Sequence, residues 1–162
     1  MPQLLKDGNV IDNSWQLVDA DTDALPQGDI LVSTSQWHEQ QGLLANHAGA
    51  VGVWIDSHEE IEAFADGIID LPVIAINFPK FADGRGFSLA RLLRERYGYS
   101  GEIRAIGEII RGQLFMMQRC GFNGFAFDTD LDLAEASKSL QDFSDAYQVA
   151  VDQPEPLFKR RA

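Results

Sequence analysis

Apolar residues in this chain gather in short runs that alternate with longer segments in which they recur at helical spacing. Residues 73–76 are all apolar and mostly β-branched, which is typical of a strand buried on both faces. Leu89, Leu92 and Leu93 follow with the spacing of one helical face. The alternation occurs five times, and the predicted strand and helix ranges are, in order, 30–33 and 37–47, 51–55 and 59–67, 73–76 and 87–97, 103–106 and 108–120, and 124–127 and 131–147.

The N-terminal residues 2–17 follow a different pattern, which predicts a small β-hairpin turned around Asp7-Gly8. Together with the five strand–helix units, this predicts an α/β fold. We expect an open, mainly parallel five-stranded sheet with helices on both faces, preceded by the hairpin. A closed (β/α) barrel is the alternative, but it requires eight strands and typically about 250 residues.

The length of 162 residues and the apolar content of 45% suit a single domain with one core. We assign residues 1–152 to this α/β domain, with the hairpin at 2–17 and the α/β core at 30–147. Residues 153–162 contain two prolines and end in basic residues, which predicts a flexible C-terminal tail.

A formal net charge of −12 makes the chain strongly acidic. Such a charge repels phosphate backbones and anionic membrane surfaces, so we expect neither nucleic acid nor membrane as a partner, and a basic protein surface suits it better. Cys120 is the only cysteine, which excludes an internal disulfide and a thiolate metal cage. The first residues do not resemble a secretory signal, and no run reaches the length of a membrane span, so a cytoplasmic protein is expected.

The segment 77–88 lies between a predicted strand and a predicted helix, and it contains the most unusual chemistry of the chain. Ligands bind at the carboxyl edge of open parallel sheets, where this loop is expected. Its glycines and the free N–H groups of the helix start suit an anion, and the basic side chains would reinforce the site. The predicted anion- or partner-binding residues are Lys80, Asp83, Gly84, Arg85, Gly86, Ser88 and Arg104. The alternative is a plain turn in which Arg85 pairs with a neighbouring carboxylate.

Arg104 lies in a strand that should be largely buried, where an arginine needs a partner. In one interpretation it reaches the crevice beside Arg85. In the other it forms a buried ion pair, with Asp128 or Glu108 as the expected carboxylate, or it occupies an edge position. Carboxylates just past the strand ends could also bind Mg²⁺, but helix capping accounts for them better, and no metal site is predicted.

The segments 78–94, 101–107 and 119–125 resemble an uncharacterised bacterial family, catalogued as a domain of unknown function, number nine hundred and thirty-four. The resemblance covers most of residues 30–128. Members of that family are typically encoded beside assimilatory sulfite reductase and are often labelled as oxidoreductases, which implies a role in sulfate assimilation. The residues that fit its core motif are Phe78, Pro79, Asp83, Gly84, Arg85, Gly86, Phe87 and Ser88. The family brings no agreed catalytic residues, so the catalytic residues and the cofactor stay unknown.

Three hypotheses follow. The first is an accessory protein of sulfite reduction that binds a partner, such as sulfite reductase, and a small anion at the carboxyl edge of the sheet. The second is a nucleotide-dependent oxidoreductase that uses the loop 77–88 as a phosphate site, although the dinucleotide fingerprint lacks its third glycine and no P-loop occurs. The third is a structural α/β domain without a ligand.

Overall fold

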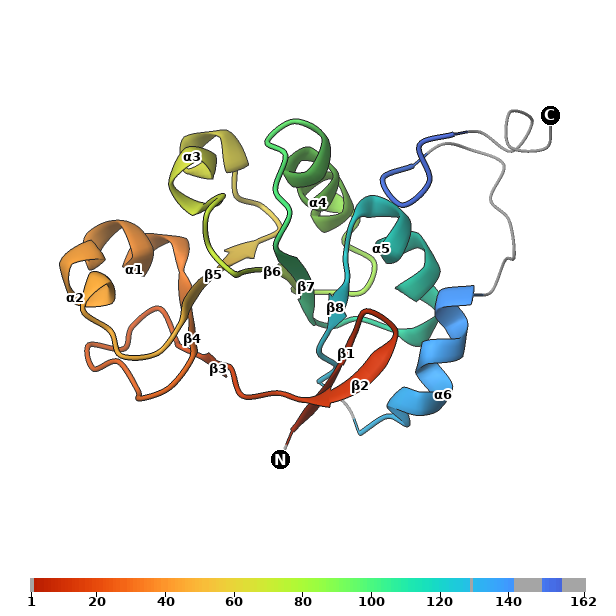
Figure 1. Ribbon diagram of the computed structural model, residues 1–162, viewed down its shortest axis with the longest axis horizontal. Coiled ribbons are helices and arrows are strands. Elements are labelled where there is room, and N and C mark those ends of the chain that lie inside the picture. Colours follow the sequence, from red (N-terminus) through yellow and green to blue (C-terminus); the bar gives the residue numbers. More distant parts are fainter. Residues whose placement is uncertain (1, 129, 142–149, 156–162) are drawn as a thin grey trace.

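The computed structural model describes residues 2–128, 130–141 and 150–155, in which eight strands form one sheet (Figure 1). The strands are β1 (Gln3–Lys6), β2 (Asn9–Asp12), β3 (Gln16–Leu17), β4 (Ile30–Ser33), β5 (Val51–Asp56), β6 (Val73–Phe78), β7 (Glu102–Gly107) and β8 (Gly124–Phe125). The helices are α1 (Thr34–Glu39), α2 (Gln41–Ala45), α3 (Ala65–Ile68), α4 (Arg85–Glu95), α5 (Leu114–Cys120) and α6 (Leu133–Ser137), with 3₁₀ turns at Ile61–Ala63, Arg111–Gln113 and Lys138–Gln141.

The sheet order is β2-β1-β8-β7-β6-β5-β4-β3. Strands β3 to β8 are parallel and follow one another in chain order, whereas β1 pairs antiparallel with both β2 and β8. The α/β class and the N-terminal hairpin are therefore confirmed. The predicted number of five strands is wrong, because the hairpin joins the sheet and the two-residue strand β3 extends its other edge. The eight-stranded sheet is mixed, although most of its strand pairs are parallel, as expected.

Strand order also decides where the helices lie. When each parallel strand is added next to the preceding one, right-handed crossovers place every connecting helix on the same face. Figure 1 shows α1 to α5 on one side of the strands. Buried residues of α2 to α6 join a single apolar cluster, and the partly buried Trp37 of α1 packs against it. The prediction of helices on both faces is thus wrong, because it assumed a strand order that reverses midway.

The connection between β2 and β3 shows that the sheet curls strongly. These strands form opposite edges of the sheet, yet only residues 13–15 separate them in the chain. Eight flat strands would hold the two edges about 34 Å apart, whereas so short a link spans at most about 14 Å. The sheet therefore bends toward a barrel, and Figure 1 shows the link crossing the side opposite α1 to α5.

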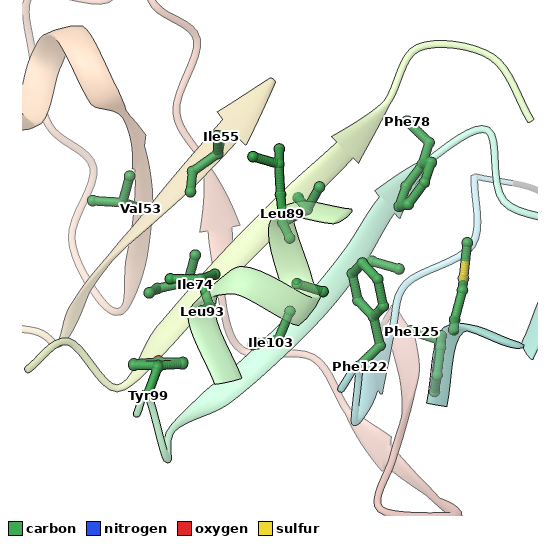
Figure 2. Packing of buried hydrophobic residues seen from close by; sticks show 14 of the residues in the cluster. Val53, Ile55, Ile74, Phe78, Leu89, Leu93, Tyr99, Ile103, Phe122 and Phe125 are labelled. Carbon is green, nitrogen blue, oxygen red and sulfur yellow. The ribbon is translucent and has the colours of Figure 1, made fainter. Parts of the chain in front are cut away.

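We call the helix-covered side the outer face and the other side the inner face. Alternate residues of the central strands, including Val53, Ile74 and Ile103, point outward into the large apolar cluster shown in Figure 2. Phe78, Phe87 and Phe122 pack there, with ring centroids 5.6 to 6.5 Å apart. The inner face has a separate, smaller cluster, which consists of Leu31, Val73, Ala75 and Ile106 with Trp15, Trp54 and Ala126 packed against it.

Several predicted helices are shorter than their sequence pattern indicated. The segment 37–47 forms α1 and α2, which meet at Gln40, and the segment 59–67 forms a 3₁₀ turn and the four-residue α3. Helix α1 begins earlier than predicted, because Ser33 and Gln36 form a capping box at its start. Residues 142–147 of the predicted helix 131–147 and residues 156–162 of the predicted tail lie outside the described residues. The predicted division into domain and tail stays a prediction.

Candidate functional site

A compact hydrogen-bonded network joins Ser57, Asp83 and Arg85 at the carboxyl edge of the sheet. The Asp83 carboxylate accepts hydrogen bonds from Arg85 Nη2 at 2.7 Å, from Arg85 Nε at 3.0 Å and from the Ser57 hydroxyl at 2.7 Å. These donors, led by the Arg85 side chain, hold the pKa of Asp83 well below its usual range, and the same pairing raises the pKa of Arg85. The network keeps both side chains charged and orients the guanidinium of Arg85, whose side chain stays 61% exposed.

A second group of polar side chains continues along the same edge toward β4. The Glu59 carboxylate accepts the Asp56 backbone N–H at 2.7 Å and also the hydroxyl of Thr34. Asn77 Nδ2 donates to Asp56 Oδ1 at 3.4 Å, and His58 Nδ1 lies 3.5 Å from Asp56 Oδ2. Within the part of the chain that the structure describes, no group of three or more His, Cys, Asp or Glu residues could hold a metal ion. The group therefore links the ends of β4, β5 and β6 through hydrogen bonds.

The loop residues singled out by the sequence lie together at the start of α4, which Arg85 begins. Lys80 and Ser88 are exposed, and Gly84 is the N-cap residue. Gly84 and Gly86 were expected to provide backbone conformations that other residues avoid. The structure shows otherwise, because φ is −83° at Gly84 and neither glycine has a positive φ. Gly86 is needed for space, because a Cβ there would lie 2.6 Å from Cζ of the buried Phe78 ring.

Arg104 lies apart from this loop, on the inner face, where its side chain is only 2% exposed. Its Nε donates to Glu102 Oε1 at 2.6 Å, and Lys6 Nζ approaches the other oxygen of the same carboxylate at 3.2 Å. Asn13 Oδ1 accepts from Arg104 Nη1 at 3.2 Å, and the guanidinium carbon lies 5.9 Å from the centre of a Trp15 ring. The predicted buried ion pair thus exists, but the expected partners Asp128 and Glu108 are wrong, because residues 102 and 104 of one strand share a face.

A hollow of about 300 Å³ opens where the inner face meets the carboxyl edge. Arg104, apolar side chains of the inner face and polar residues near the strand ends line it together. The full lining consists of Asn13, Trp15, Leu17, Leu31, Asn77, Arg104, Ile106, Gly107, Ala126, Phe127 and Asp128. Gly107 has φ of 87°, and a Cβ there would lie 2.5 Å from Asn77 Oδ1, so only glycine fits this rim. Asn77 connects the hollow to Asp56 and hence to the edge network.

An apolar groove of about 390 Å³ lies next to the hollow and shares Gly107, Phe127 and Asp128 with it. Its walls include Phe81, which is 53% exposed, and Ile110, which is 46% exposed. Gln113 Nε2 donates to the Phe81 backbone oxygen at 2.7 Å and so fixes the loop against the start of α5. The loop 77–88 therefore places an exposed aromatic ring and an exposed guanidinium at the same edge.

The sequence reasoning missed Asn13 and Trp15, which complete the surroundings of Arg104. The available signal was Trp15 itself, a large apolar ring that the sequence analysis assigned only to the hairpin segment 2–17. Its position over Arg104 depends on the curl of the sheet, which no local pattern reports. The other residue that changes the environment of this site, Glu102, was visible in the sequence two positions before Arg104.

The chain belongs to the family described as Bacterial protein of unknown function (DUF934), which matches residues 52–158. The predicted family is therefore confirmed, although the matched range begins and ends later than the resemblance suggested. No curated protein and no solved structure matches the chain. Among the described residues, none of the helices is long and apolar enough to cross a bilayer.

Proposed function

We propose that this protein is an accessory protein of sulfite reduction in sulfate assimilation, which binds a partner protein and a small anion at the carboxyl edge of its sheet. The link to sulfur metabolism comes from the family resemblance, and sulfite reductase is the proposed partner. The observation that carries the binding role is the exposed Arg85 guanidinium, which Asp83 and Ser57 hold in place. A cation with a fixed orientation loses less freedom on binding than a mobile one.

The neighbouring groove supplies the apolar part of the proposed protein interface. Phe81 and Ile110 expose large apolar surfaces beside a polar rim that contains Glu108 and Arg111. Aromatic and arginine side chains are the residue types that most often dominate binding energy in protein interfaces. The net charge of −12 adds long-range attraction to a basic partner surface, so association should be faster at low salt.

The experiment that tests this function is co-purification of sulfite reductase from cells at low salt, with the natural protein and two variants. Arg85→Ala removes the oriented guanidinium and is expected to reduce the captured reductase. Arg91→Ala is the matched control, since Arg91 lies on the same helix and pairs only with the exposed Glu95 in the described residues. Equal recovery of the reductase with Arg85→Ala and Arg91→Ala would contradict a role for the edge network. If the natural protein captures no sulfite reductase, the proposal that this enzyme is the partner is wrong.

Growth on sulfate as the sole sulfur source gives an independent readout. Cells that contain only the Arg85→Ala variant are expected to grow more slowly on sulfate and normally on cysteine, because only the first requires sulfite reduction. Unimpaired growth on sulfate, together with unchanged partner capture, would identify the loop as scaffold.

A further inference from the structure

Two cations on the inner face share one buried carboxylate. Lys6 and Arg104 both contact the single carboxylate of Glu102, at 3.2 and 2.6 Å. In residues 2–128, 130–141 and 150–155, neither cation has an ion pair with another carboxylate. Lys6 is partly exposed and can be stabilised by water, but Arg104 is 2% exposed. A buried cation that shares its counter-ion is costly, and an additional anion would stabilise it.

The guanidinium also has unused hydrogen-bonding capacity. Arginine carries five N–H groups, and those of Arg104 donate to Glu102 and to Asn13 within the described residues. The remaining N–H groups belong to a side chain that lines the hollow of the inner face. Guanidinium N–H groups that have no partner form strong, charge-assisted hydrogen bonds with a carboxylate.

The walls of the hollow indicate what should accompany that carboxylate. Leu31, Ile106 and Ala126 line it with apolar surface, and the Trp15 side chain adds an aromatic wall. A volume of about 300 Å³ is at the lower end of the range for small-molecule sites. The site is therefore suited to a small molecule with an apolar body and one anionic group.

We propose that this hollow binds a small organic carboxylate, whose carboxylate pairs with Arg104 and whose apolar or aromatic body lies against Trp15 and Ile106. Asn77 and Asp128 at the rim supply polar groups for a substituent of the same ligand. The proposal goes beyond the partner-binding function, because the hollow and the Arg85 network use different side chains and the contacts of Arg104 include none of those of Arg85.

Benzoate is the probe that tests the site, with benzamide as the neutral isostere and sulfate as the inorganic anion. The indole N–H resonances of Trp15, Trp37 and Trp54 are followed by NMR during each titration, with the Trp15 signal assigned by Trp15→Phe. Benzoate is expected to shift the Trp15 resonance in a saturable way and benzamide to leave it in place. No saturable shift, an equal shift with benzamide, or a stronger response to sulfate than to benzoate would overturn the proposal.

Two variants test whether the Arg104 guanidinium is responsible for benzoate binding. Removing Arg104 alone would leave Glu102 without its buried partner, so the primary variant carries Arg104→Gln and Glu102→Gln together. It is expected to bind benzoate about 10- to 100-fold more weakly, because charge-assisted hydrogen bonds are lost. If this protein does not fold, Arg104→Lys takes its place, since lysine keeps the charge but not the paired donors. Unchanged benzoate affinity in the folded variant would overturn the proposal.

Arg85→Gln is the matched control for this site and is expected to bind benzoate as the natural protein does. This control separates the two proposals. Loss of sulfite reductase capture in Arg85→Gln with intact benzoate binding supports both, whereas absence of benzoate binding in a protein that still captures the reductase overturns only the carboxylate site. A loss of benzoate binding in Arg85→Gln would contradict the separation of the two sites and overturn the proposal as stated.

Discussion

On the outer face, β6 contributes Ile74, Ile76 and Phe78 to a large core covered by helices, whereas on the inner face the same strand contributes Val73, Ala75 and Asn77. The outer residues are packed against further apolar side chains (Figure 2). The inner ones share their face with a buried ion pair and a hollow. Burial of apolar surface is non-directional and tolerates many sequences, while a buried ion pair requires particular partners. The outer face therefore supplies stability, and the inner face is where specific chemistry is concentrated.

The largest effect is expected from opening the outer core. Phe78→Ala removes a fully buried ring that contacts Phe87 and Phe122. The free energy of unfolding should fall by about 3–5 kcal/mol, because both transfer energy and packing are lost. Urea denaturation measures the change. Phe81→Ala is the control, since that ring is exposed, and it should change stability by less than about 0.5 kcal/mol. Similar losses in the two variants would contradict the assignment of Phe78 to the core.

A smaller effect, of different origin, is expected on the inner face. Glu102→Gln leaves Arg104 buried without a counter-ion and should cost about 1–3 kcal/mol of unfolding free energy. Adding Arg104→Gln removes the uncompensated charge, so the double variant should be more stable than Glu102→Gln alone. Denaturant curves of both variants and of Arg104→Gln give the coupling energy. Additive losses would show that the two side chains act independently and would contradict the ion pair.

Tyr99 tests how much a buried polar group contributes to stability within the outer core. Its hydroxyl donates to the Leu71 backbone oxygen at 2.8 Å, so Tyr99→Phe should cost about 1 kcal/mol at neutral pH. Burial raises the pKa of Tyr99 above its ordinary value of 10.0. Above that pH the unfolded chain releases a proton that the folded protein retains, so stability should fall as pH rises. Thermal unfolding between neutral and alkaline pH should show a shallower decline in Tyr99→Phe, and parallel declines would contradict the shift.

The smallest effect on stability is expected at the exposed edge network. Because Arg85 and Ser57 lower the pKa of Asp83, its carboxylate stabilises the folded state above the unfolded pKa, and this contribution is lost as the pH falls below it. Asp83→Asn should therefore lower stability slightly near neutral pH, where this contribution is present, and should weaken the dependence of stability on pH in the acid range. Thermal unfolding in an acid series measures this. If the stability of Asp83→Asn falls with decreasing pH as steeply as that of the natural protein, the ion pair between Asp83 and Arg85 does not contribute as stated.

The sequence was a reliable guide to elements and a poor guide to their arrangement. Residues 73–76 were recognised as a strand because a continuous apolar run is unusual outside a buried sheet. The break at Gln40 was missed because apolar spacing continues across it. At the site, the pairing of Arg85 with a carboxylate was one of the two interpretations available, since Asp83 lies two residues away. The partner of Arg104 was missed because the carboxylates considered, Asp128 and Glu108, lie past strand ends, whereas Glu102 lies two residues before Arg104 on the same strand and face.

The amino-acid pattern alone determined that this chain forms an α/β sheet with an N-terminal hairpin, and that a loop with exposed charges follows the central strand. These properties depend on residues close together in sequence, where spacing and turn chemistry act directly. Tertiary structure alone decided the eight-stranded order, the single helix-covered face and the hollow around Arg104. The reason is that a three-residue link joins opposite edges of the sheet and brings Trp15 and Asn13 to a strand some ninety residues away.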